Sequence, residues 1–143
     1  MTDTAPALHL AMAADLAALE SLRLRARHFM LHHQVDEHAV AAVELVLEEA
    51  LSNIVRHGYV HQVRSGEPIG VDLQIGPGAV QLLIVDDARA FDPLAVAESA
   101  LAVTLDKAAM GGLGLLMIRR TAASASYERR AGRNRLTLSV ART

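Results

Sequence analysis

The chain has 143 residues, of which 52% are hydrophobic and 3% aromatic, and its formal net charge is -2. This length fits one domain with a sizeable aliphatic core. The small net charge gives no broad basic field, which disfavours nucleic acid and anionic membranes as primary partners, and the few rings disfavour base stacking on aromatic side chains.

The sequence contains no cysteine, which excludes disulfides, thiolate metal sites and cysteine nucleophiles. Near the N-terminus, Asp3 stands where a secretory signal would carry a basic residue. No uninterrupted apolar stretch reaches the roughly 18 residues that a membrane-spanning helix needs. These features predict a cytoplasmic protein without membrane contact.

The first half of the chain predicts one strand and two helices. Residues 7–12 fit a short strand, and residues 14–33 fit an amphipathic helix with an arginine-rich outer side. Asp36 is a candidate N-cap for a second helix that runs to about His57 or Gly58. The predicted inward positions of the first helix are Leu16, Leu19, Leu22, Leu24 and Phe29. Those of the second are Val40, Val43, Leu47, Ala50 and Ile54.

The second half predicts more strand than helix. Residues 71–75 and 80–86 fit two strands joined by a Gly-Pro-Gly turn, and the apolar run LLIV makes the second a candidate central strand. A long connection with a short helix at residues 94–103 leads to a helix at 113–122, and SASYERR and NRLTLSV form a β-hairpin pattern. This order predicts a single α+β domain over residues 1–143, with helices on one face of a mixed, mainly antiparallel sheet.

Glu49, Asn53 and His57 are each four residues apart and share one stripe of the second predicted helix, away from its apolar stripe. A carboxylate and an amide in this arrangement suit phosphoryl transfer. The carboxylate orients the attacking hydroxyl, and the amide oxygen holds Mg²⁺ that is bound to nucleotide phosphates. Taken alone, the stripe is more typical of an exposed helix face with ordinary polar residues.

Two further segments point to a nucleotide. A strand ends in Asp86 and Asp87, and an ionised carboxylate there can accept a hydrogen bond from the exocyclic amine of adenine. The alternative is a turn in which these residues cap backbone amides. The GGLG segment at residues 111–114 runs into a helix and is either a phosphate cradle or a flexible turn. It has neither the P-loop nor the dinucleotide-binding pattern.

Taken in chain order, these segments resemble the N box, G1 box and G2 box of the GHKL (Bergerat-fold) ATP-binding superfamily. The resemblance rests on EALSNIVRHGY, on FDP after the acidic strand end, on GGLGLLMIRR and on YERRAGRNRLTLSV, and it covers most of the chain. Within the superfamily the details look most like the anti-sigma-factor serine kinases of the RsbW and SpoIIAB kind. The resemblance implies a two-layer α/β sandwich, a histidine-kinase-like ATPase domain (HATPase_c), with an ATP lid at about residues 94–110.

The resemblance also implies a role for each residue at a matching position. Glu49 matches the catalytic carboxylate that takes the proton of the attacking serine, and Asn53 matches the Mg²⁺-binding amide beside the phosphates. Asp86 matches the aspartate that reads adenine. The remaining ATP-binding positions that it implies are His57, Ala88, Ala90, Phe91, Lys107, Gly111, Gly112, Leu113, Gly114 and Leu115.

Two features depart from the family pattern. Relatives commonly have glycine in the G1 loop where this chain has Ala88 and Ala90, so the loop either uses ordinary backbone dihedrals or binds nucleotide less well. In some relatives a lid arginine reaches the terminal phosphate, whereas this lid offers only Lys107 before the glycines. Arg119 and Arg120 could substitute, although solvated helix arginines are the commoner case.

Other polar clusters have weaker functional interpretations. His28 and His32 share a helix face but lack the acidic partner of a zinc motif, and Ser52 with His57 lacks the nucleophile elbow of a hydrolase. The arginines of the final hairpin predict a solvated tip or, less commonly, a docking site for an acidic partner. They are Arg129, Arg130, Arg133 and Arg135.

The resemblance implies an ATP- and Mg²⁺-dependent serine/threonine protein kinase that acts as an anti-sigma factor in a partner-switching module. The resemblance implies a STAS-domain antagonist as substrate, a sigma factor as a further partner, and a homodimer. The altered G1 loop and the absent lid arginine favour an alternative, a nucleotide-gated binding protein with little or no phosphotransfer activity. A third, weaker alternative is a histidine-kinase-like domain that acts on a histidine of a separate protein.

Overall fold

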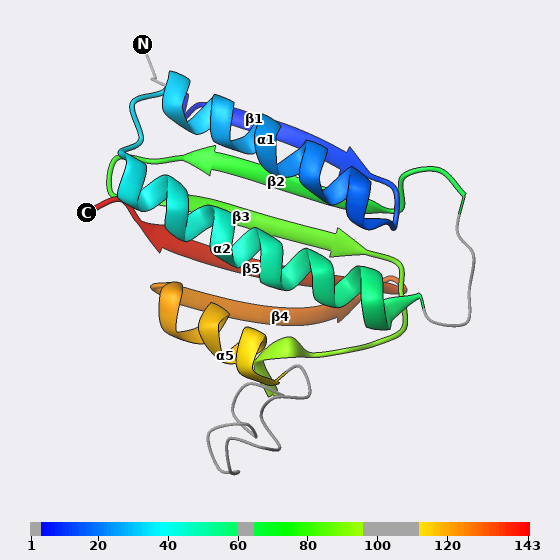
Figure 1. Cartoon of the computed structure of the whole chain (residues 1–143). Helices are drawn as coiled ribbons and strands as arrows, with labels where there is room; N and C mark the ends of the chain where they lie inside the picture. The colour runs from blue at the N-terminus through cyan, green and yellow to red at the C-terminus, as the bar shows by residue number, and fades with distance from the viewer. Residues whose placement is uncertain (1–3, 60–64, 96–111) are drawn as a thin grey trace.

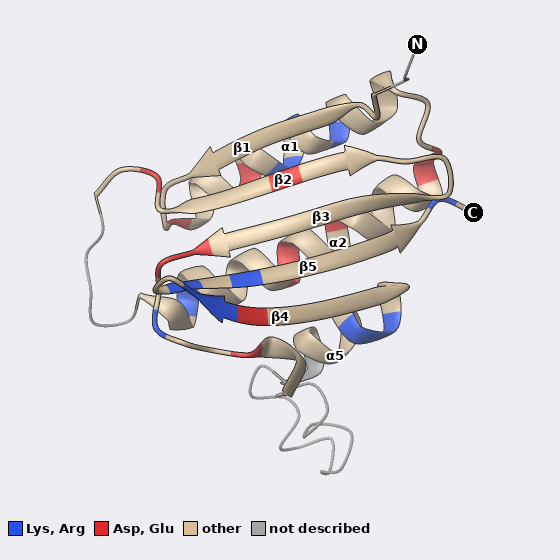
Figure 2. Cartoon of the chain, turned by 180° about the vertical axis from the view of Figure 1, so that it is seen from behind, with Lys and Arg blue, Asp and Glu red and all other residues tan. Residues whose placement is uncertain are grey.

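Five strands form one sheet in the order β1-β2-β3-β5-β4, and the helices lie on one of its faces (Figure 1). The structure is a computed structural model that describes residues 4–59, 65–95 and 112–143. Seen from behind, the other face of the sheet carries no helix of the described ranges (Figure 2). This two-layer α+β arrangement confirms the predicted fold class.

The order of the elements also agrees with the prediction. Their bounds are β1 Ala7–Met12, α1 Leu16–His32, α2 Glu37–Asn53, a π-helical turn η1 Ile54–Gly58, β2 Ile69–Ile75, β3 Ala79–Asp86, α5 Gly112–Thr121, β4 Ser124–Arg130 and β5 Arg133–Ala141. A helical turn also covers residues 93–95, and the rest of the helix predicted at 94–103 lies outside the described residues.

Both long helices begin at an aspartate whose side chain satisfies a free backbone amide. The Asp15 carboxylate accepts from the Ala18 N–H at 2.7 Å, and the predicted cap Asp36 accepts from the Ala39 N–H at 2.8 Å. The second helix reaches Gly58 as expected, but its last five residues form a wider π-helical turn. Such turns are rare and are often found at functional sites.

All four strand pairs of the described residues are antiparallel, so the parallel pair implied by a mixed sheet is not found among them. The chain leaves β3, passes through α5 to the edge strand β4, and returns by a tight hairpin as β5 beside β3. β3 is therefore the middle strand, as its apolar run predicted. Its last residue, Asp86, lies opposite Asn134 of β5.

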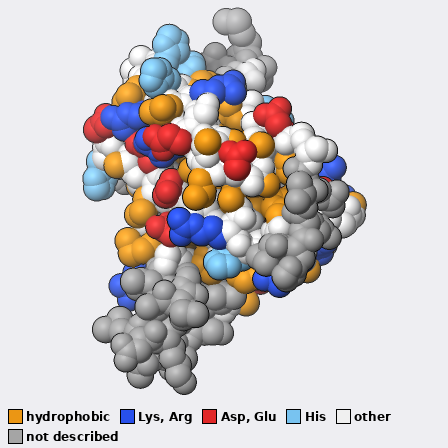
Figure 3. All heavy atoms as spheres, turned by 45° about the vertical axis from the view of Figure 1, so that its right-hand side comes forward, with side chains coloured by type: hydrophobic (Ala, Val, Ile, Leu, Met, Phe, Trp, Pro, Cys, Tyr) orange, Lys and Arg blue, Asp and Glu red, His pale blue; other side chains and the backbone are white. Residues whose placement is uncertain are grey.

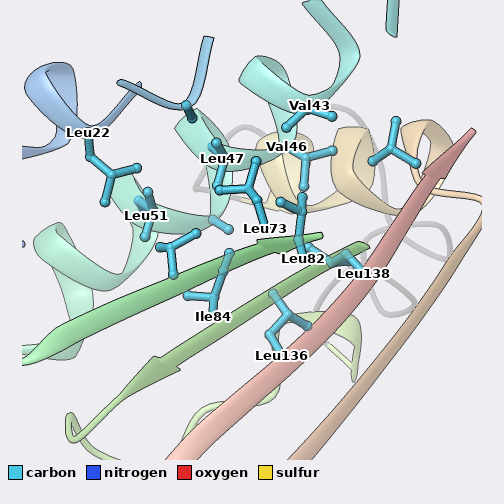
Figure 4. Close-up of a cluster of buried hydrophobic side chains, with 14 of the residues drawn as sticks. Leu22, Val43, Val46, Leu47, Leu51, Leu73, Leu82, Ile84, Leu136 and Leu138 are labelled. Atoms are coloured by element: carbon cyan, nitrogen blue, oxygen red, sulfur yellow. The ribbon is translucent and has the colours of Figure 1, made fainter. Parts of the chain in front are cut away.

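The core lies between the helices and the sheet and is aliphatic (Figure 4). The α2 stripe Val40, Val43, Leu47 and Ala50 is buried as predicted, and Ile54 is half-buried. For α1 the prediction was wrong at Leu16 and Leu24, which are 48% and 44% exposed. The buried side of α1 instead follows a spacing of three and four residues through Leu19, Leu22, Ala26 and Met30.

Two arginines of α1 face α2 rather than solvent. Arg23 and Arg27 both bind Glu44 of α2, and the Arg27 Nη1 to Glu44 Oε1 distance is 2.5 Å. On the face that Figure 3 shows, several acidic and basic side chains lie next to one another. Within the described ranges, no helix combines the length and the apolar character that crossing a bilayer requires.

Candidate active site

Two adjoining pockets lie where the end of α2, the loop after β3 and the start of α5 meet. Counted with the solvent-open space at their mouths, the larger spans about 490 Å³ and the smaller about 360 Å³. Asn53 and His57 line both pockets. The polar stripe of α2 and η1 therefore forms the boundary between them.

The smaller pocket gathers the polar side chains of this stripe. Glu49, Asn53 and His57 line it together, as their spacing predicted, and Arg56 joins them from η1. Within the described residues, none of these four side chains makes a hydrogen bond or an ion pair. Four polar groups around one hollow, without partners in the described part of the chain, are suited to bind a polar ligand.

The start of α5 closes the other side of the smaller pocket. Gly114 and Leu115 line it, and a methyl group added to Gly114 would collide with the Glu49 carboxylate. Only glycine at this position lets the carboxylate lie against the first turn of α5, the part of a helix whose backbone amides have no partner within the helix. A helix start with this close approach is suited to hold an anion next to Glu49.

A buried carboxylate lies in the larger pocket. Asp86 is 3% exposed, and its Oδ1 accepts from the Asn134 side-chain amide at 2.9 Å and from the Ala88 N–H at 3.0 Å. Both bonds fall on Oδ1, so among the described residues Oδ2 keeps its capacity to accept a hydrogen bond. The larger pocket is lined by Ala50, Asn53, Ile54, His57, Gly58, Asp86, Ala88, Arg89, Phe91, Pro93, Tyr127, Asn134 and Leu136.

Burial raises the pKa of the Asp86 carboxyl above the ordinary 3.8. The hydrogen bonds from Asn134 and from the Ala88 N–H oppose this shift, as does the charge of Arg129, while the neighbouring Asp87 adds to it. The ionised carboxylate is thus held away from water, which lowers the stability of the folded state. Such a group is typical of a ligand site.

The loop after β3 uses ordinary backbone dihedrals. Among the described non-glycine residues only Gln34 and Ala131 have positive φ, so neither Ala88 nor Ala90 is strained. Of the two possibilities raised for these alanines, the structure therefore shows the first, a loop with ordinary backbone dihedrals. Ala88 lines that pocket, whereas Ala90 lines neither pocket.

Three side chains from outside the loop hold it in place. The Tyr59 hydroxyl donates to Asp87 Oδ1 at 2.7 Å, and Arg129 Nη1 donates to the Ala88 carbonyl at 2.8 Å. The Asn134 amide donates to the Arg89 carbonyl at 2.9 Å. Burial and the bond to Asp87 raise the pKa of Tyr59, so this hydroxyl stays a donor at neutral pH.

Asn134 was not anticipated as a site residue. Its Oδ1 accepts from the Tyr127 hydroxyl at 2.5 Å and from the Phe91 N–H at 3.3 Å, in addition to the bonds donated by its amide. The sequence contains a sign of this role, because Asn134 alternates with Leu136 and Leu138 along NRLTLSV and so lies on the same, inward face of the strand. An asparagine on the core face of a strand needs several partners, which marks it as a candidate.

Arg56 was also missed as a site residue. Its sequence position, seven residues after Glu49, places it on the same helical stripe. Arg119 and Arg120, considered earlier as substitutes for a lid arginine, lie in the last turn of α5. Of the arginines in the described ranges, Arg56 is the one that lines the smaller pocket.

Three of the four aromatic residues lie at this site despite the low aromatic content. Phe91 and Tyr127 line the larger pocket, and Tyr59 binds the loop beside it. Of the hairpin arginines, Arg129 holds the Ala88 carbonyl and Arg135 lies 3.3 Å from Glu128, so they are not simply a solvated tip.

The remaining predicted positions are near the site or cannot be placed. Gly112 is the first residue of α5, and Leu113 follows it. Lys107 and Gly111 lie outside the described residues, as does the predicted lid from residue 96 onward. In the described ranges, no three His, Asp or Glu side chains come together to hold a metal ion.

Comparison with known proteins identifies the family of this fold and site. Residues 12–140 match the histidine kinase-like ATPase domain family (HATPase_c_2). The chain belongs to this family. The assignment agrees with the GHKL resemblance and spans every element from the end of β1 to β5.

Individual relatives of the histidine kinase-like ATPase domain are also similar to the chain. It is 38% identical over 96 residues to the serine/threonine-protein kinase BtrW of Bordetella bronchiseptica, which is 66% of this chain and 65% of BtrW, just under two thirds of that protein. The structure of the RsbU and RsbW domains of a Mycobacterium tuberculosis protein has a TM-score of 0.67 at 22% identity, covering 96% of this chain and 33% of that chain. The structure of the SiaB–SiaC complex of Pseudomonas aeruginosa has a TM-score of 0.64 at 21% identity, and the match covers 94% of this chain and 89% of that chain. Both structures support the fold.

Replacing Asp86 by Asn is expected to raise the free energy of unfolding of the nucleotide-free protein near neutral pH. Because burial raises the pKa of Asp86, the folded state holds its proton more tightly than the unfolded chain, and ionisation destabilises the fold. The gain should be full above the raised pKa, shrink as pH falls through it, and vanish below 3.8. Urea unfolding of both proteins across this pH range measures it, and a variant less stable than wild type at neutral pH would contradict it.

Proposed function

We propose that this protein is an ATP- and Mg²⁺-dependent serine/threonine protein kinase of a partner-switching module. The observation that carries the proposal is the placement of Glu49. Its carboxylate has no partner among the described residues, touches the glycine start of α5 and shares a pocket with Asn53. The pocket with buried Asp86 adjoins it. A base-reading group on one side and a free carboxylate on the other are what phosphoryl transfer from ATP requires.

In this proposal the larger pocket binds adenine. Asp86 Oδ2 accepts a hydrogen bond from the exocyclic amine, because an ionised carboxylate only accepts and that amine donates. Guanine presents a carbonyl oxygen at the same position, which the carboxylate repels. Phe91 and Tyr127 lie along the pocket and exclude water from the base.

The smaller pocket then binds the phosphates. The first turn of α5 offers backbone amides, Arg56 offers a guanidinium group, and Asn53 is the residue suited to hold Mg²⁺. One amide is sufficient, because Mg²⁺ takes its other ligands from phosphate oxygens and water. When bound, the ion neutralises phosphate charge.

Glu49 is proposed as the general base. It accepts the proton of the attacking serine hydroxyl as the serine oxygen forms its bond to the terminal phosphorus and the bond to ADP breaks. The adjacent glycine start of α5 keeps the carboxylate close to the phosphate position. His57 lines both pockets and is proposed to contact the nucleotide between base and phosphates.

The names of similar proteins support a protein substrate. BtrW is a serine/threonine-protein kinase, and SiaB forms a complex with SiaC. We propose that the substrate is a STAS-domain antagonist, that a sigma factor is a second partner, and that the kinase works in the cytoplasm as a homodimer with residues 94–110 as its lid. The alternative of a nucleotide-gated binding protein retains one argument, the lid without an arginine. Arg56 weakens this argument, because its guanidinium group can supply the positive charge at the proposed phosphate pocket.

Replacing Glu49 by Gln is expected to lower the rate of phosphate transfer to a STAS-domain protein by about 10²–10⁴-fold, the usual contribution of a general base. ATP binding should persist, because Asp86 and α5 are unchanged. Phosphate-affinity gels measure transfer and calorimetry measures binding. The matched control is Glu48→Gln, an exposed neighbour on α2. Equal rates for both variants would remove Glu49 from the mechanism, and wild type that binds ATP and partner without transfer would support the binding-protein alternative.

Replacing Arg56 by Ala is expected to lower kcat by about 10²-fold, because a positioned cation stabilises charge that develops on the transferring phosphoryl group. Arg56→Lys should restore part of the rate, since lysine keeps the charge without the planar fork. Steady-state kinetics with varied ATP measures both. Arg25→Ala, at an exposed position of α1, is the control. If Arg56→Ala matches Arg25→Ala, the neutralising charge comes from elsewhere in the chain.

A further inference from the structure

The last residue of η1, Gly58, lies against Ala88 of the loop after β3, and both line the larger pocket. A methyl group added to Gly58 would come within 2.9 Å of the Ala88 methyl carbon and 3.5 Å of Ile54 Cγ2. The first distance is shorter than side-chain packing allows. Among the described glycines only Gly66 and Gly132 have positive φ, so Gly58 is needed for space and not for backbone conformation.

We propose that Gly58 is a positioning residue of the nucleotide site. The space at Gly58 receives the Ala88 methyl group and thereby keeps the loop and Asp86 in the geometry that binds the base. This inference rests on the proposed ATP site and assigns a role within it to a residue without a side chain.

Ala88 has little freedom to move away from a larger residue at position 58. It is 2% exposed, and its N–H donates to Asp86 Oδ1 at 3.0 Å. Its carbonyl accepts from Arg129 at 2.8 Å and from Asn134 at 3.4 Å. A displacement of Ala88 therefore pulls on the carboxylate that faces the base or breaks the bonds that hold the loop.

The pair also explains how this chain accommodates an alanine at a position where the resemblance leads one to expect glycine. One methyl group fits between η1 and the loop after β3, and here Ala88 supplies it. Moving that methyl group from residue 88 to residue 58 conserves the packed volume, whereas methyl groups at both positions overpack the contact. The two residues should therefore behave as one steric unit with a large coupling between their substitutions.

A double-mutant cycle tests the proposal with ATP and Mg²⁺ as the probe. The proteins are wild type, Gly58→Ala, Ala88→Gly and the double variant, each titrated by calorimetry and melted without nucleotide. Gly58→Ala should bind ATP about tenfold more weakly or worse, in line with the usual cost of overpacking. The ATP affinity of the double variant should lie within about threefold of that of Ala88→Gly, a margin that allows for the usual deviation from additivity between two substitutions. The control is Gly78→Ala, in the β2–β3 turn with no atom within 4 Å, which should bind as wild type.

Each other outcome decides the proposal. The proposal would be overturned if Gly58→Ala bound ATP as tightly as wild type, or if the double variant bound ATP as weakly as Gly58→Ala. If Gly58→Ala fails to fold, the comparison of the double variant with Ala88→Gly decides. If wild type itself binds no ATP, the proposed function fails separately, and the steric pair is then judged by whether Ala88→Gly restores the melting temperature lost in Gly58→Ala.

Discussion

The hydrogen bond from Asn134 to Asp86 is the contact on which the rest of the site depends. It joins the end of β3 to the start of β5, where the two residues are opposite each other in the sheet. Asn134 also binds the Arg89 carbonyl and accepts from Tyr127, so one buried amide holds the carboxylate, the loop and the pocket wall together. A buried charge without such partners would destabilise the fold far more. Among the described residues, the second carboxylate oxygen accepts no hydrogen bond and can accept one from a ligand.

The two layers of the fold contribute different chemistry. The end of the middle strand β3 supplies Asp86 to the larger pocket, whereas the end of α2 and the start of α5 supply the polar groups of the smaller pocket. Two close contacts need glycine: Gly58 of η1 against Ala88 of the loop after β3, and Gly114 of α5 against Glu49 of α2. Small residues at these points let helix and loop approach closely enough for both pockets to share one wall.

Most of the fold could be predicted because its signals are local. The alternation of β3 and β5, the Asp36 cap and the buried stripe of α2 follow directly from short-range patterns. The polar stripe from Glu49 to His57 was found by its spacing, and the structure places it at the pocket boundary. Leu24 was misplaced because α1 has several leucines, and only packing against α2 and the sheet selects which of them are buried.

What the sequence could not supply were the contacts between distant segments. Asn134 reaches Asp86 across 48 positions of the chain, and Gly114 meets Glu49 across a still longer stretch, so no local pattern reveals either pairing. The same limit applied to the loop alanines, whose conformation depends on bonds from Arg129 and Asn134. The roles of these residues follow from the three-dimensional arrangement.

Calorimetric titration with ATP and with GTP, each with Mg²⁺, tests most directly whether Asp86 reads the base. Saturable binding of ATP, with no binding of GTP at the same concentrations, is the predicted result. Equal binding of both nucleotides would contradict recognition of the exocyclic amine by the carboxylate. Binding of neither at millimolar concentration, an affinity weaker than roughly -4 kcal/mol, would contradict the nucleotide site itself.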